Sequence, residues 1–418
     1  MLKKILYILI IVTIQQKVIA NDNKDILIKN ATVYTIEGKT ILSNHDVYIS
    51  NGMIKNLGKN LSSASKNTQV IDAKGQVLTP GFFAGINEIG LEEVPSEKSS
   101  INSLFHPINS EGIRMTGDFS FDIDLLKAYD HKSVNINIAK SQGYSYFFLR
   151  PEEFIGIGYV MNLENSYPDS KKVPQFLFIN FSSVAKESLG GSIASITYYF
   201  DFLMNKNQNE SSISFNKESK NLLRNFIKNG TIIFQAISEI EIRQVIELKK
   251  KYSMNRVIVM IANEAHLLAK ELAKENIGVI LNPLENLPKN FSAIYSSLES
   301  AALLSKAKVP VAFMKERDFT ANARSIRFEA GIAVSHGLDW HEALESMCLT
   351  PYKMMGIQNV GKIKVDYVAN VTLWNGDPLE SSSWAQLVII NGKIQSLEDR
   401  QRLLAEKYWK MHQEFVKK

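Results

Sequence analysis

The residue types that most often carry catalysis are few in this chain, and their spacing excludes several common chemistries. The seven histidines form no HxH or HExxH pair, so the sequence does not indicate a histidine-based zinc site. No GxSxG sequence marks a serine nucleophile. The single cysteine, Cys348, lies in ALESMCLT, which is typical of the apolar side of a helix rather than of a reactive thiol.

The middle of the chain alternates between strand and helix patterns. Short apolar strands are expected at 231–237, 256–262, 277–283 and 309–314, with helices between them. Ser238 with Glu241, and Asp339 with Glu342, have the spacing of helix capping boxes. Strands that recur every 20–30 residues with helices between them predict parallel βαβ units. At this length we expect an α/β fold, a TIM-type (β/α)8 barrel over residues 80–360.

The two ends of the chain are β-rich. Residues 25–79 alternate apolar and polar positions and contain the turn Asn51-Gly52, and the segment near 390 contains Asn391-Gly392. We expect residues 21–79 and 361–397 to pair into one small composite β-sandwich. We expect residues 398–418 to form a C-terminal helix that packs across the seam between the barrel and the sandwich. Within 95–220 the sequence predicts little beyond one helix and one strand in 135–151.

The first twenty residues have the pattern of a secretory signal peptide. Lys3 and Lys4 precede an apolar run, and Val18-Ile19-Ala20 offers a cleavage site after Ala20. The apolar run is shorter than the roughly 20 residues of a membrane span. We therefore expect a periplasmic protein without a membrane span after cleavage. Its formal charge of +5 falls to about +2 without the signal, which gives no reason to expect nucleic acid as a partner.

Three segments together carry a resemblance to a known family. QVLTPGFFAGINEIGL (76–91) resembles the first barrel strand of the amidohydrolase superfamily, in the imidazolonepropionase-like branch, where PGFIDxHxH is usual. Residues 322–357 and 360–394, with the turn WNGDPL, resemble the family's last helices and closing strands. The resemblance implies an active site at the carboxyl ends of the barrel strands, a divalent metal such as zinc, and hydrolysis of carbon–nitrogen bonds other than peptide bonds.

The resemblance also assigns positions to the metal ligands. The two histidine positions of the first strand hold Ile86 and Glu88, the fifth-strand position holds Gln235, and the sixth-strand position holds Asn263. The eighth-strand aspartate falls at Glu316, with Asp318 as an offset choice. Isoleucine cannot bind zinc and neutral amides bind it weakly. We therefore predict a pocket at Ile86, Gln235 and Asn263, no family-type metal site, and Glu88 and Glu316 as candidate catalytic residues.

Two functions remain open at this stage. Glu88 and Glu316 could act as an acid–base pair, with calcium or magnesium better suited to them than zinc, in a hydrolase of small amides. Alternatively both are structural and pair with Lys315 or Arg317, and the barrel is a non-catalytic scaffold. In that case it would bind a small-molecule ligand, a second copy of the chain or an active paralogue.

Overall fold

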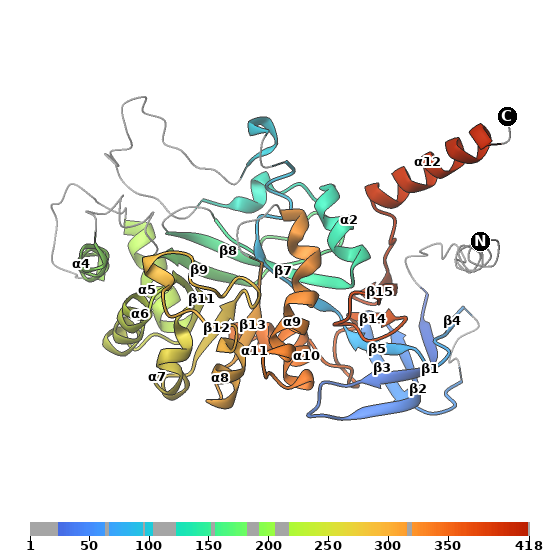
Figure 1. Cartoon of the computed structure of the whole chain (residues 1–418), viewed down its shortest axis with the longest axis horizontal. Helices are drawn as coiled ribbons and strands as arrows, with labels where there is room; N and C mark the ends of the chain where they lie inside the picture. Colours follow the sequence, from blue (N-terminus) through green and yellow to red (C-terminus); the bar gives the residue numbers. More distant parts are fainter. Residues whose placement is uncertain are drawn as a thin grey trace.

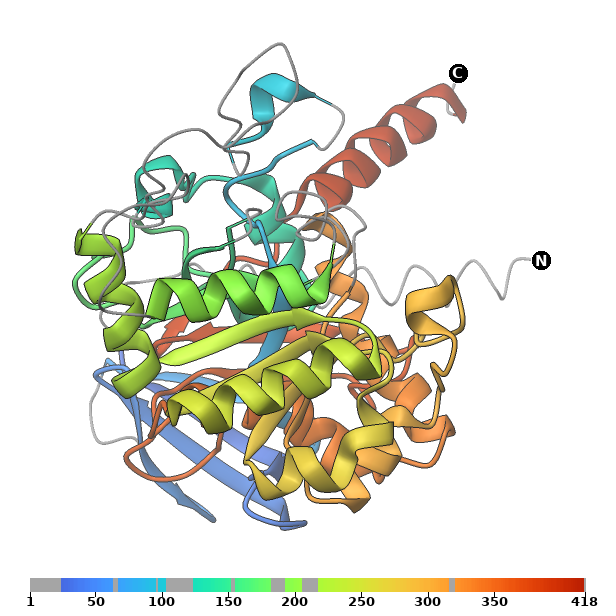
Figure 2. The ribbon, with the colours of Figure 1, turned by 90° about the vertical axis from the view of Figure 1, so that its left-hand side faces the viewer.

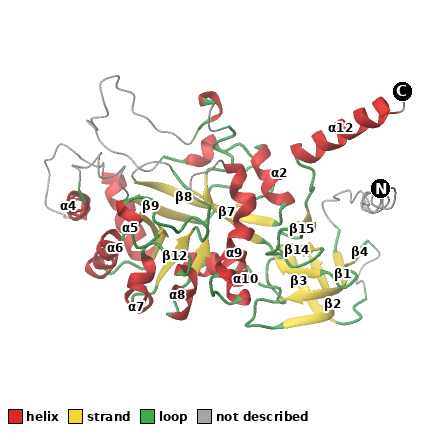
Figure 3. Ribbon diagram, viewed as in Figure 1, coloured by secondary structure: helices red, strands yellow, loops and turns green. Residues whose placement is uncertain are grey.

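The structure, a computed structural model, describes residues 24–62, 67–94, 97–102, 123–151, 155–181, 192–204, 217–315 and 320–416. The expected signal segment, residues 1–20, lies outside this part of the chain. Two eight-stranded sheets make up the molecule, and most helices surround one of them (Figure 1, Figure 3). The fold is thus mixed α/β, as predicted.

The smaller domain is one sheet built from both ends of the chain. Its strands are β1 (Ile26–Tyr34), β2 (Ile41–Ser50), β3 (Met53–Gly58), β4 (Gln69–Asp72), β5 (Val77–Pro80), β14 (Val371–Trp374), β15 (Ala385–Ile390) and β16 (Lys393–Ile394). The order is β16-β15-β14-β5-β1-β2-β3, with β4 paired to β1. The C-terminal strands enter through β14, which pairs antiparallel with β5.

Both expected hairpin turns of this sheet are confirmed. Asn51 and Gly52 have φ angles of 51° and 78°, and Asn391 and Gly392 have φ angles of 50° and 75°. Such left-handed backbone suits a two-residue hairpin turn. The turns also pack together, because a Cβ atom added at Gly392 would lie 2.5 Å from the Cα of Gly52. The close packing therefore requires glycine at Gly392, and the positive φ favours glycine at both positions.

The larger sheet is a nearly closed barrel. Its strands are β6 (Phe82–Asn87), β7 (Tyr144–Leu149), β8 (Ile155–Asn162), β9 (Gln175–Asn180), β10 (Thr231–Ala236), β11 (Arg256–Ile261), β12 (Ile277–Leu281) and β13 (Val311–Phe313). They pair in chain order, and β13 comes back into contact with β6. The predicted TIM-type barrel is confirmed, with one departure: β8 is antiparallel to both β7 and β9. The link between β7 and β8 is too short for the crossover that a parallel pair needs.

Helices cover the outside of the barrel, and Figure 2 shows several of them lying across its strands. They are α2 (Val134–Ser141), α4 (Ile193–Met204), α5 (Lys217–Asn229), α6 (Glu239–Tyr252), α7 (Ala269–Lys274), α8 (Ser300–Lys306), α9 (Ile326–Ser335), α10 (Trp340–Cys348) and α11 (Thr350–Met355). The capping box of Ser238 and Glu241 opens α6 as expected. At α10 only Asp339 caps the helix, since the carboxylate of Glu342 accepts a hydrogen bond from Ser305 instead.

The inside of the barrel is filled with apolar side chains. Phe83, Phe148, Phe178 and Ile280 belong to this inner cluster, which continues into α11 through Tyr352. The rings of Tyr352 and Tyr146 stack with their centroids 3.8 Å apart. This packing leaves the carboxyl ends of the strands as the place where polar side chains can gather.

The C-terminal helix α12 (Arg400–Val416) does not have the expected role. It buries none of its residues, and Figure 1 shows it projecting away from both sheets. The prediction that it packs across the domain seam is therefore wrong. Hydrophobic residues at helical spacing predicted the helix, but they do not cover any described part of the molecule.

Candidate functional site

Two charged side chains meet at the carboxyl ends of the first two barrel strands. The register of β6 and β7 pairs Ile86 with Phe148 and Asn87 with Leu149, which places Glu88 beside Arg150. Gly85, with φ of 78°, interrupts the regular pairing of β6 and sets this register. Nη2 of Arg150 lies 2.7 Å from Oε1 of Glu88, and both side chains are less than one-fifth exposed.

The Arg150 guanidinium has further contacts inside the barrel mouth. It lies over the ring of Phe178 from β9, 5.6 Å from the ring centroid, and its Nη1 donates to the carbonyl oxygen of Pro151 at 3.3 Å. A guanidinium combines a permanent charge with a flat face that stacks on aromatic rings. Arg150 therefore places a fixed positive charge next to Glu88.

Of the two partners expected for Glu88, Lys315 and Arg317, the structure assigns Lys315 to other carboxylates. Lys315, at the end of β13, pairs with Glu329 at 3.0 Å and with Glu285 at 3.3 Å. Burial alone would lower the pKa of Lys315, but these two carboxylates outweigh burial and raise it. Lys315 thus stabilises the contact between β13 and α9. Glu316, Arg317 and Asp318 lie outside the described residues.

The former ligand positions are buried but lie on separate strands. Ile86 is 3% exposed and belongs to the inner apolar cluster. Gln235 of β10 is buried in register with Asn180 of β9, so two amides lie side by side at this edge. Asn263 is buried, and in the chain it follows Ile261 and Ala262, two residues with positive φ at the end of β11.

Asn180 was missed because β9 falls in a segment without a clear sequence pattern, and Arg150 was missed although the strand before it, β7, was expected. The available signal for Arg150 was a charged residue directly after the apolar strand YSYFFL and before Pro151. A charged residue at the carboxyl end of a barrel strand is a candidate site residue.

Glu264 joins three loops at the barrel mouth. Glu264 follows β11 in the chain, and its side chain is buried. Its Oε2 accepts a hydrogen bond from the backbone N–H of Glu239 at 2.8 Å, and its Oε1 accepts one from the backbone N–H of Tyr295 at 2.9 Å. His266 follows in the 3₁₀ helix η4 (Ala265–Leu268), and burial lowers its pKa. Across the described ranges, no three His, Cys, Asp or Glu side chains are grouped so that they could hold a metal ion.

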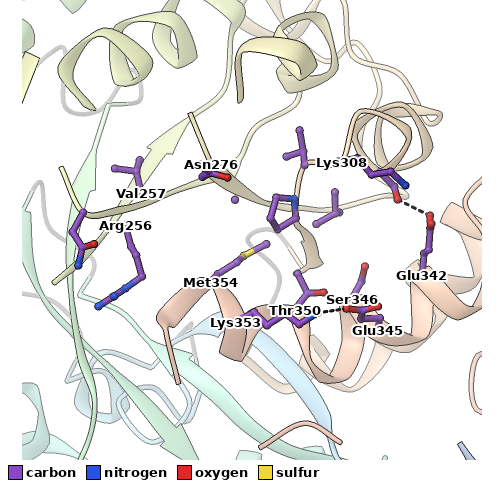
Figure 4. A pocket seen from close by; sticks show the side chains of 16 residues that line it. Arg256, Val257, Asn276, Lys308, Glu342, Glu345, Ser346, Thr350, Lys353 and Met354 are labelled. Atoms are coloured by element: carbon purple, nitrogen blue, oxygen red, sulfur yellow. Dashed lines mark hydrogen bonds and ion pairs between the residues drawn. The ribbon is translucent and has the colours of Figure 1, made fainter. Parts of the chain in front are cut away.

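A separate cavity of about 590 Å³ lies at the opposite, amino ends of β11, β12 and β13 (Figure 4). Charged groups at its wall include Arg256, Lys308 and Lys353, and Nζ of Lys353 lies 2.6 Å from Oε1 of Glu345. None of the candidate residues named above lines this cavity. It is therefore distinct from the barrel mouth.

The barrel is joined to a second sheet that is built from both ends of the chain. Proteins of known sequence or structure share parts of this chain or its fold. Residues 210–395 match the sequence model of the amidohydrolase family. The match spans β10 to β16.

Solved structures agree over nearly the whole chain. An amidohydrolase from Thermotoga maritima MSB8 is 20% identical, with a TM-score of 0.74 over 89% of this chain and 99% of that one. The triazine hydrolase from Arthobacter aurescens is 14% identical, with a TM-score of 0.56 over 92% of this chain and 98% of that one. At this identity the likeness shows the fold.

Curated relatives match over shorter stretches. Amidohydrolase tasK of Hapsidospora irregularis is 35% identical over 75 residues, or 18% of this chain and 8% of the relative. An adenine deaminase of Clostridium botulinum is 39% identical over 61 residues, or 15% of this chain and 10% of the relative. The alignments thus span a tenth or less of these relatives' lengths.

Proposed function

We propose that this protein is an exported, amidohydrolase-like protein with a degenerate metal site, which binds a small molecule at the barrel mouth without metal-dependent hydrolysis. The ion pair between Glu88 and Arg150 carries the proposal. In the imidazolonepropionase-like branch, which the sequence resembles, position 88 would supply a metal ligand. Here the carboxylate at that position is neutralised by a guanidinium of the chain itself.

Electrostatics supports this view of Glu88. A divalent ion on its carboxylate would come within a few ångströms of the guanidinium. At 4 Å and an effective dielectric constant near 20, such a pair repels by about 8 kcal/mol. Arg150 cannot give up its charge at physiological pH. It would therefore have to move away from both Glu88 and the Phe178 ring before an ion could bind.

The remaining positions do not fit the family's metal either. Ile86 has no donor atom, and Gln235 and Asn263 offer neutral amides, which are weak zinc ligands. Among the described residues, His266 belongs to no group of three His, Cys, Asp or Glu side chains that could hold a metal ion. The described residues thus do not fit a zinc centre.

A second candidate function is metal-dependent hydrolysis of a carbon–nitrogen bond other than a peptide bond. The amidohydrolase family domain over residues 210–395 favours it, since hydrolysis of this kind is the activity that the family resemblance implies. Glu88 and Glu316 would then be the catalytic carboxylates. The two functions differ in one measurable property, a bound metal that is needed for turnover.

The test uses the full chain, expressed with added zinc and manganese. Metal content is measured by elemental analysis, melting temperature is followed with each metal and with a chelator, and hydrolysis is assayed on small linear and cyclic amides. We expect far less than one metal per chain, no change of melting temperature on chelation, and no turnover. One tightly held metal per chain with chelator-sensitive hydrolysis would establish the second function instead.

Export is tested separately. We expect the protein from the periplasmic fraction of its bacterial host to begin at Asn21, as read by N-terminal sequencing. A protein that retains Met1 in the cytoplasmic fraction would contradict the proposed export. In the part of the chain that the structure describes, no helix is long and apolar enough to cross a membrane.

A further inference from the structure

The C-terminal helix α12 exposes an unusual amount of apolar surface. All of its large apolar side chains are between 39% and 79% exposed, and they are Leu403, Leu404, Tyr408, Trp409, Met411, Phe415 and Val416. Isolated helices of about this length are marginal in water, and most helices are stabilised by packing an apolar face. A helix that buries nothing therefore calls for a partner that covers it.

The start of the helix is fixed to the body of the protein. Oδ1 of Asp399 accepts a hydrogen bond from the backbone N–H of Arg402 at 2.8 Å and so caps the helix. Nη1 of Arg324, close to the start of α9, donates to Oε1 of Gln401 at 2.8 Å. The first turn is thus oriented by the barrel, while the following turns extend into solvent (Figure 1).

Four of the apolar side chains form a narrow seam. Leu404, Tyr408, Met411 and Phe415 follow one another at intervals of four, three and four residues. This is the spacing at which two helices pack side by side in a coiled coil, with these positions as the a and d sites. Leu403, although equally exposed, lies off the seam.

We propose that this seam pairs with the same seam of a second copy of the chain, with the two helices antiparallel. Charge complementarity selects this partner. Lys407 and Glu414 both flank the seam at g positions, and in an antiparallel pair each Lys407 faces Glu414 of the second copy. In a parallel pair Lys407 would instead face His412 of the second copy, which offers no carboxylate.

The polar face of α12 distinguishes this partner from a lipid surface. It carries both signs of charge, with Glu406 and Glu414 among Arg400, Arg402, Lys407 and Lys410. Helices that lie on membranes have polar faces rich in Lys and Arg. The mixed charge of α12 is typical of helices that pair with other helices.

The test is sedimentation velocity of the full chain over a wide concentration series. We expect a monomer–dimer equilibrium that Tyr408→Glu abolishes and that the off-seam control Leu403→Glu leaves intact. Because α12 buries no residue against its own chain, both variants should keep the melting temperature that the wild type has at concentrations where it is monomeric. A monomer at every concentration, or a dimer that Tyr408→Glu does not weaken, would overturn the proposal.

A charge exchange tests the direction of the pairing. Lys407→Glu puts two like-charged contacts into an antiparallel dimer and should raise its dissociation constant roughly tenfold. The double variant Lys407→Glu/Glu414→Lys should restore the wild-type value. Failure of the double variant to rescue would reject the antiparallel seam. If the monomer binds vesicles of anionic lipid and Tyr408→Glu abolishes this binding, the partner of the seam is a membrane surface and the proposed dimer is wrong.

Discussion

The guanidinium of Arg150 and the carboxylate of Glu88 form an ion pair across the ends of two neighbouring barrel strands, with 2.7 Å between Nη2 and Oε1. Neither strand end alone would hold its charge at this depth, because each side chain is largely removed from water. The pair therefore fixes the positions of both strand ends. The guanidinium of Arg150 also matches the negative charge of Glu88 at the barrel mouth.

A double-mutant cycle measures this relationship. Arg150→Met should lower the free energy of unfolding by about 2 kcal/mol, because the largely buried carboxylate of Glu88 loses the guanidinium charge beside it. Glu88→Gln should cost a similar amount, and the double variant should cost less than the sum, with a coupling of about 1–2 kcal/mol. Chemical denaturation of the four proteins gives these values. Strictly additive effects would show that the pair contributes nothing as a pair.

Glu264 should control the order of the loops at the barrel mouth. Its two carboxylate oxygens accept hydrogen bonds from the backbone N–H groups of Glu239 and Tyr295. Glu264→Ala removes both acceptors, and we expect a loss of about 2 kcal/mol of stability. The amides of Glu239 and Tyr295 should exchange with deuterium faster. The exposed Glu247→Ala is the control, and unchanged exchange in Glu264→Ala would contradict this role.

Arg327 should be essential for holding α9 against the smaller sheet. It is 2% exposed, and its guanidinium donates to the carbonyl oxygens of Pro378, Glu380 and Ser383 at 2.6–3.0 Å. Arg327→Met leaves these acceptors without their donor, so we expect a loss of about 3 kcal/mol or more. Thermal and urea unfolding provide the measurement. Arg324→Met removes a guanidinium that donates a hydrogen bond to Gln401 in α12, so this variant should change stability little.

We expect the titration of Lys140 to raise the free energy of unfolding at alkaline pH. Burial lowers its pKa to about 8, although Glu164 partly offsets the effect. In the unfolded chain a lysine keeps its proton to about pH 10.4. Between these values the unfolded state binds more protons, so the free energy of unfolding increases with pH across this window.

The variant Lys140→Met isolates this contribution. This variant removes the cost of burying the charged ammonium group. At pH 7 its free energy of unfolding should therefore exceed that of the wild type by an amount on the order of 1–3 kcal/mol. The difference between variant and wild type should shrink as the pH rises from 8 to 10. A difference that stays constant over that range would mean that Lys140 does not titrate there.

Much of the fold could be predicted because its signals are local. Asn-Gly turns tolerate positive φ, the Ser238–Glu241 box caps its own helix, and alternating apolar residues indicate half-buried strands. The strands β10 to β13 followed from short apolar runs separated by helices. The segment that contains β8 was not predicted, because an antiparallel strand within a parallel barrel breaks the repeating pattern on which the prediction relied.

The sequence by itself determined the two sheets, the order of the last four barrel strands and the residues at the former ligand positions, since each depends on neighbouring residues. Only the tertiary structure decided that Glu88 faces Arg150 rather than Lys315, because strand register and the break at Gly85 bring distant residues together. It also decided that α12 stands apart from the body. Periodicity shows that a helix has an apolar face, but what that face contacts depends on the packing of the whole chain.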